Sequence, residues 1–111
     1  MATTLNFDDI FGKMLNAAKT ALGANWPKLR DLATSSVKAL AQNLVDIEQM
    51  RINGTITEEQ AKLKMSLQKD AFKILLLSEE GMALLTAEAI LNAVLDVVKG
   101  TINTAIGFAV L

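Results

Sequence analysis

The sequence contains no cysteine, no histidine and no tyrosine, and it has only one proline and one tryptophan. Without cysteine the chain can form neither disulfides nor thiolate metal sites. Without histidine it lacks the side chain best suited to proton transfer near neutral pH, and no imidazole is present to activate a serine nucleophile. We therefore expect a protein that is not an enzyme and that has no catalytic residue.

Glycine is scarce as well, and its six copies are scattered singly, so the chain has no glycine-rich phosphate-binding loop. Di-iron helical bundles need Glu-x-x-His pairs, which a chain without histidine cannot supply. Glu88 and Asp96 are expected on one helix face with Asn92 between them. In an oligomer they could converge on a hard cation, but a polar stripe that fixes helix register is the simpler interpretation. The sequence predicts no cofactor and no metal site.

Neither sign of charge is in excess, because 11 basic and 12 acidic residues leave a net charge of −1. Such a chain has no global field that would attract nucleic acid. Lys62, Lys69 and Lys73 fall roughly on one side of a predicted helix with acids nearby, which is typical of a solvated face. We expect no specific binding to nucleic acid.

The first nine residues contain no basic segment, and they include the acids Asp8 and Asp9. A secretory signal peptide begins with a positively charged region, so this pattern predicts that no signal peptide is present. It favours a cytoplasmic protein or a component of a larger assembly, and it leaves the compartment otherwise unknown.

Apolar residues, by contrast, make up 51% of the chain, and the mean hydropathy is positive. This is high for a small chain with much surface to cover, and it indicates an interface with protein or lipid. The longest charge-free run in the last third covers 100–111 and is much shorter than the roughly 20 residues that a spanning helix needs. A simple transmembrane helix is not expected, whereas peripheral membrane contact remains an alternative.

The first predicted helix is short and amphipathic and covers 7–22. Asn6 is a suitable N-cap, and Gly23 suits the position that ends the helix. Apolar residues fall on one face, beginning with Phe7 and Phe11. We expect this face to pack on the core, although two phenylalanines could also insert into a membrane interface.

The second predicted helix covers 26–52. Pro27 fits its first turn, where a missing N–H costs nothing, and Asn53-Gly54 is a strong stop signal. Apolar residues form a seam at near-heptad spacing, which predicts the buried face of this helix: Leu29, Ala33, Val37, Leu40, Leu44 and Ile47.

The third predicted helix is very long and covers 58–99. Thr57 and Gln60 form a capping box at its start, in which each side chain can bond to the other residue's backbone N–H. Between Thr57 and Lys99 there is no proline, and Gly81 is the only glycine. We expect a continuous helix, or one kinked near Gly81; the alternative is a break over 78–81. In its first half the predicted apolar face comprises Leu63, Leu67, Ile74 and Leu77.

The short loop after the second helix forces antiparallel neighbours. The predicted fold is therefore all-α and a single domain over 1–111: a long antiparallel hairpin of 26–52 and 58–99 plus the short N-terminal helix 7–22. The apolar tail 100–111 is expected to be helical. A straight helix of about 40 residues would be a rod near 60 Å long, against a radius of gyration near 13 Å for a compact monomer. We therefore expect an oligomeric helical bundle.

The C-terminal helix is the predicted contact between copies, because from 82 to 99 it is apolar around most of its girth and must be covered on several sides. A narrow polar stripe of Glu88, Asn92, Asp96, Lys99 and Asn103 interrupts it. Rows of small residues such as Ala89 and Ala93 suit either tight core packing or a self-associating face. The predicted oligomer interface comprises Leu84, Leu85, Leu91, Val94, Leu95, Val98, Ile102 and Ala105.

The predicted function is accordingly structural. We expect a non-enzymatic assembly protein that forms a homo-oligomer, such as a virion, phage or secretion-type component, with another protein as an alternative partner. The second interpretation is a membrane-interacting protein that engages lipid through 82–111 and through Phe7 and Phe11. The third is a helical bundle that binds a small molecule in a cavity.

Overall fold

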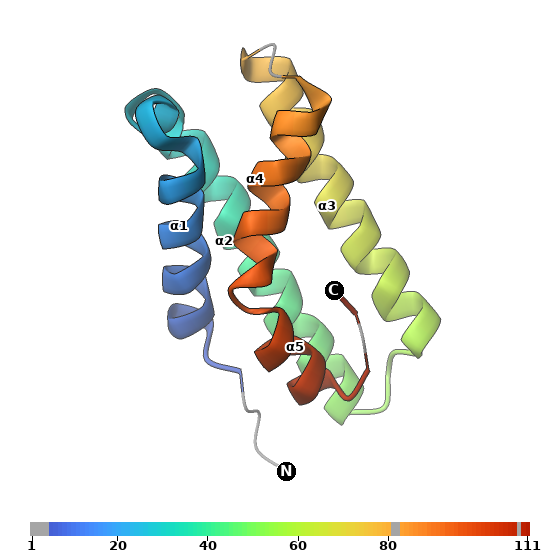
Figure 1. The fold of residues 1–111 in the computed structure, drawn as a ribbon. Coiled ribbons are helices and arrows are strands. Elements are labelled where there is room, and N and C mark those ends of the chain that lie inside the picture. The colour runs from blue at the N-terminus through green and yellow to red at the C-terminus, as the bar shows by residue number, and fades with distance from the viewer. Residues whose placement is uncertain (1–4, 81–82, 109) are drawn as a thin grey trace.

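The protein is built almost entirely of helices (Figure 1). The computed structural model describes residues 5–80, 83–108, 110 and 111, and these residues contain no strand. The predicted all-α class is confirmed. The elements are α1 (Phe7–Leu22), the short 3-10 turn η1 (Gly23–Asn25), α2 (Trp26–Ile52), α3 (Glu58–Glu80), α4 (Leu84–Asp96) and α5 (Lys99–Ile106).

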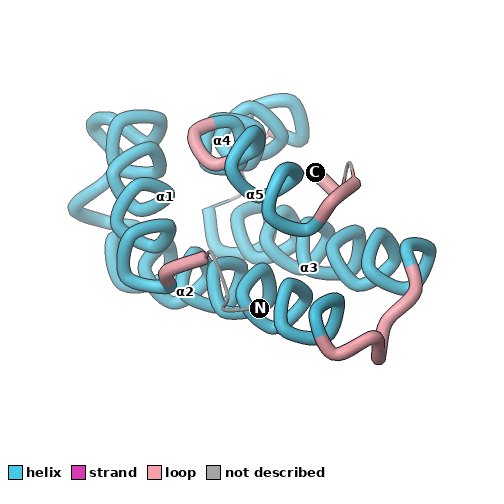
Figure 2. The backbone as a smooth tube through the Cα atoms, turned by 90° about the horizontal axis from the view of Figure 1, so that it is seen from below, coloured by secondary structure: helices cyan, strands magenta, loops and turns pink. Residues whose placement is uncertain are grey.

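The four longer helices form an up-down-up-down bundle. Successive helices reverse direction, and α4 returns between α1 and α3 (Figure 1). Helices α1 and α3 each contact both α2 and α4. Viewed along the bundle, α2 and α3 make one layer and α1 and α4 the other, while α5 continues below α4 and contacts α2 (Figure 2). The predicted hairpin of the second helix with the start of the third is therefore confirmed.

The prediction of one long helix over 58–99, continuous or kinked near Gly81, is wrong, and the alternative of a break over 78–81 is closer to the structure. Helix α3 ends at Glu80, α4 begins at Leu84 and packs back against α3, and a bend of 60° separates α4 from α5. Gly81, the expected site of a kink, lies outside the described residues. The bundle is 42 Å in its longest dimension, with a radius of gyration of 13.9 Å. Folding back buries the apolar girth of the C-terminal segment inside the same chain, which a straight rod would leave in water.

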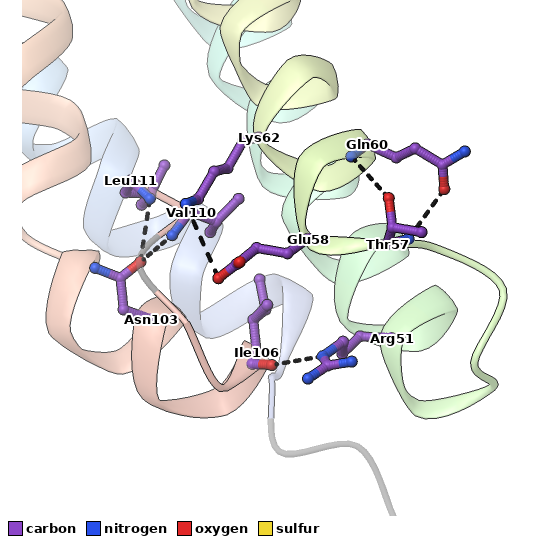
Figure 3. A network of polar contacts seen from close by, with 9 residues as sticks. All are labelled: Arg51, Thr57, Glu58, Gln60, Lys62, Asn103, Ile106, Val110 and Leu111. Carbon is purple, nitrogen blue, oxygen red and sulfur yellow. Dashed lines mark hydrogen bonds and ion pairs between the residues drawn. The ribbon is translucent and has the colours of Figure 1, made fainter.

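The helix ends follow the chemistry predicted from the sequence. The Asn6 side chain accepts a hydrogen bond from the Asp9 N–H at 3.0 Å. The Gln60 N–H donates to the Thr57 hydroxyl at 3.1 Å, and the Thr57 N–H donates to Gln60 Oε1 at 2.9 Å (Figure 3). Both bonds of the predicted capping box are thus present, and they fix the start of α3. Gly54, with a φ of 70°, adopts the left-handed conformation just after α2.

Replacing Thr57 by alanine should destabilise the protein by about 1 kcal/mol, because the first turn of α3 loses the acceptor for the Gln60 N–H. Urea denaturation followed by circular dichroism measures the change. Thr57→Ser is the matched control, since it keeps the hydroxyl and should stay close to wild type. Equal urea midpoints for wild type, Thr57→Ala and Thr57→Ser would contradict a stabilising role of the cap.

The core lies where the four long helices meet. All six residues of the predicted α2 seam are buried, and the N-terminal helix turns its predicted face inward. Phe7, Phe11 and Leu15 are half-buried and pack against the core. The fully buried part of the α1 face is Ile10, Met14, Ala18 and Leu22.

Candidate interaction surface

Most of the C-terminal residues predicted to contact a second copy lie inside the chain's own bundle. Helix α4 packs against α1 and α3, and α5 packs against α2, so no separate copy is needed to cover them. Only Leu84 and Leu85 remain open to solvent, with 52% and 80% of their surface exposed, while Ala105 is half-buried. The predicted oligomer interface must therefore be corrected. The folded chain cannot offer to a second copy the predicted residues that the bundle buries: Leu91, Val94, Leu95, Val98 and Ile102.

The predicted polar stripe lies at the edge of the bundle. Asn92, Asp96 and Lys99 are exposed, and Glu88 and Asn103 are half-buried. Among the described residues no group of three or more His, Cys, Asp or Glu side chains could hold a metal ion. The stripe therefore marks the solvent side of α4 and α5.

Asn103 also holds the C-terminal tail. Its Oδ1 accepts hydrogen bonds from the N–H groups of Val110 and Leu111, at 3.0 and 3.1 Å (Figure 3). The tail is helical only as far as Ile106; Gly107 then takes a left-handed φ of 96° and reverses the chain. The prediction of a helical tail over 100–111 is therefore right only for its first part.

Arg51, near the end of α2, also contacts the end of α5 and the tail that follows it. Its Nε donates to the carbonyl of Ile106 at 3.3 Å (Figure 3). Its guanidinium lies 5.3 Å from the centre of the Phe108 ring. A cation over an aromatic face at this distance is attractive. These contacts, with those of Asn103, close the base of the bundle.

Helix α3 presents large apolar side chains to solvent. Leu63, Leu67 and Ile74 are 62%, 60% and 60% exposed. The prediction that this face of α3 forms the buried side of an amphipathic helix is wrong, and of its four members only Leu77 is half-buried. The side of α3 that packs into the bundle instead carries Ala61, Met65, Phe72 and Leu76.

The exposed residues of α3 follow the spacing of a coiled coil. Steps of three, four, three and four residues connect Gln60, Leu63, Leu67, Asp70 and Ile74, which is the a and d pattern of successive heptads. All five side chains are exposed. We call this row the outer α3 seam.

The start of the outer α3 seam borders a groove between α3 and the end of α2. The groove has a volume of about 340 Å³. Half-buried Met50 and Ile56 contribute to it beside Leu63 and Leu67. It is open to solvent along its length, so it suits an apolar side chain from a partner better than an enclosed ligand.

A second groove, of about 360 Å³, lies between α1 and α4. Small residues, Ala17, Ala21 and Ala93, contribute to it, and Lys13 at its edge pairs with Asp9 at 3.3 Å. The polar side chains that line it, Lys13, Asn16 and Thr20, all come from α1, and two of them are engaged within that helix: Lys13 with Asp9, and the Thr20 hydroxyl, which donates to the Asn16 carbonyl at 3.1 Å. The interpretation as a small-molecule bundle gains no specific support here.

Membrane contact was the other alternative. Within the described ranges no single helix is long and apolar enough to cross a bilayer; α4 and α5 meet the criteria of length and composition only when joined, and they are bent by 60°. Phe7 and Phe11 stack on each other, with ring centres 5.5 Å apart, and pack against the core.

No family model, no curated protein and no solved structure matches this chain.

Proposed function

We propose that this protein is a non-enzymatic assembly protein that self-associates through the outer α3 seam. The observation that carries the proposal is the row of Leu63, Leu67 and Ile74, each at least 60% exposed on a side of α3 that the described residues leave uncovered. A contiguous row of large exposed apolar side chains is typical of a binding surface, whereas single exposed ones are ordinary. The proposed contact between copies is therefore on α3 and not on the C-terminal helix that the sequence predicted.

The pattern of the row supports a helical partner. A seam of a and d residues is the surface that a facing helix covers by packing knobs into holes. Leu84 and Leu85 add exposed apolar surface at the end of the bundle where α3 stops (Figure 1). Assembly is favoured over catalysis because the surface is apolar and the sequence has no histidine or cysteine to perform general acid–base or thiol chemistry.

Leu67→Asp tests the proposal. We expect wild type to gain mass with concentration in detergent-free buffer, measured by light scattering after size exclusion, and the variant to remain a monomer because a charge at the centre of the seam opposes apolar contact. Its thermal unfolding should be close to wild type, since Leu67 is exposed in the single chain.

Ser35→Asp is the matched control, because it places the same residue at an exposed position inside α2. It should associate like wild type. A wild type that is monomeric at every concentration would overturn the proposal, and so would a Leu67→Asp variant that still associates. Co-sedimentation of monomeric wild type with anionic liposomes would favour the membrane interpretation instead.

A further inference from the structure

We infer that the partner of the outer α3 seam is the same seam of a second copy, running antiparallel across a two-fold axis that passes near Met65 and Ser66. This inference rests on the proposed self-association and adds its geometry. Parallel and antiparallel pairs of two identical seams differ in which side chains become neighbours.

Asp70 decides between the two orientations. Asp70 lies 3.7 Å from Lys73 of its own chain. In a parallel pair each seam residue meets its own counterpart, so that two Asp70 carboxylates would face each other. Like charges placed together at an interface are strongly unfavourable. In an antiparallel pair Asp70 instead lies level with Gln60 of the second copy.

Gln60 is already oriented for that contact. Its Oε1 accepts from the Thr57 N–H at 2.9 Å, which leaves its amide NH₂ group to donate (Figure 3). An amide donor opposite a carboxylate makes a charge-assisted hydrogen bond. The antiparallel pair contains this contact twice, once on each side of the axis.

The apolar residues match in the same register. Leu67 of one copy lies level with Leu63 of the other, which makes two central leucine layers. Further out, Ile74 lies level with Ile56 of the second copy, which contributes to the groove of about 340 Å³ at the start of α3. The groove would therefore receive an isoleucine from the partner, and this gives its open, apolar shape a specific occupant.

The flank of the seam adds charge complementarity. Glu59, Ser66 and Lys73 follow one another at seven-residue intervals along one flank. A two-fold axis perpendicular to the helices brings equal flanks together, so Glu59 of each copy faces Lys73 of the other, with the two Ser66 residues between. Lys73, which also lies 3.7 Å from Asp70 of its own chain, would then stand between two carboxylates. A parallel pair would offer Glu59 to Lys64 instead. Ion pairs on a surface contribute little to the free energy of association, so the Glu59–Lys64 pairs of a parallel arrangement would not offset the repulsion between its two Asp70 carboxylates.

The seam limits the strength of the pair. From Gln60 to Ile74 it is about 21 Å long at 1.5 Å per residue. Two helices over this length bury less than the roughly 1,200–2,000 Å² of a stable complex. We therefore expect a reversible, concentration-dependent dimer rather than a permanent one.

Lys64, on the other flank, faces its own counterpart in this arrangement, so Lys64→Gln should tighten the dimer several-fold.

Cross-linking tests the orientation, because the natural chain has no cysteine to interfere. Chains carrying Glu59→Cys and chains carrying Lys73→Cys are mixed and treated with a short bis-maleimide. Helix axes in contact lie about 8–10 Å apart, so an antiparallel pair brings the two thiols within reach. We expect a covalent heterodimer from the mixture and little product from Glu59→Cys alone, whose thiols would be about 21 Å apart along the axis.

The outcomes separate the inference from the proposed function. Efficient cross-linking of Glu59→Cys with Lys64→Cys, but not with Lys73→Cys, would show a parallel pair and overturn the inference. Dimerisation of the wild type by light scattering, together with no cross-linked product from the cysteine variants, would overturn the geometry and leave self-association standing. A wild type that is always monomeric would overturn both.

Discussion

Replacing Leu91 by aspartate is expected to unfold the protein or to lower its free energy of unfolding by more than about 3 kcal/mol. Leu91 is 4% exposed in α4, the helix that packs against both α1 and α3. The substitution removes a buried apolar side chain and places a carboxylate where it is shielded from water. Both changes lower the free energy of unfolding.

Asn92→Asp is the matched control, since it introduces the same residue one position further along α4 at an exposed site. It should change the free energy of unfolding by no more than about 0.5 kcal/mol. Urea denaturation at low protein concentration, followed by far-UV circular dichroism, compares the two variants without a contribution from association. Equal tolerance of both substitutions would contradict the burial of this face of α4.

Glu48→Leu is expected to lower the free energy of unfolding by about 1–3 kcal/mol, because it leaves a buried backbone N–H without its acceptor. Glu48 lies in α2 and is 1% exposed, and its Oε1 accepts from the Leu5 N–H at 3.1 Å. Leu5 is itself buried in the core just before α1. The carboxylate thus attaches the start of α1 to α2.

Glu48→Gln is the companion variant, because its amide oxygen can still accept from Leu5. It should retain most of the stability that Glu48→Leu loses. Hydrogen exchange at the Leu5 amide gives a local readout: protection should fall in Glu48→Leu and largely persist in Glu48→Gln. Unchanged protection in Glu48→Leu would show that the bond does not hold this segment.

The parts of the fold that the sequence predicted correctly depend on neighbouring residues. The caps at Asn6 and at Thr57 with Gln60 are contacts within one helical turn, and both are present. The α2 seam is also correct, because its apolar residues form one row on an otherwise polar helix. In such segments the buried side follows from the pattern alone.

The errors arise where a helix has more than one apolar side. Helix α3 carries Leu63, Leu67 and Ile74 on one side and Met65 and Phe72 on another. Periodicity shows that both are apolar, but only the position of α2 and α4 decides which side is inside. The larger and more regular leucine row led to the wrong choice.

A related error concerns α4. Its apolar girth does require several neighbours, but the sequence pattern predicts that the neighbours of Leu91 and Val94 belong to other copies. Helix α4 packs against α1 and α3 of the same chain instead. The number of covering helices within one chain depends on where the chain turns back, between Glu80 and Leu84, and the sequence offers a break over 78–81 only as the alternative to a continuous helix.

The placement of α4 between α1 and α3 has a consequence for the order in which the molecule forms during synthesis. Helix α1 finds α2 at once, but its second neighbour is the fourth helix to leave the ribosome. At about 5–20 residues per second, the first three helices exist for seconds as an open arc with part of their inward surface uncovered. The nascent chain is then most exposed to chaperones and to mispairing, and the arrival of α4 closes the ring and ends that interval.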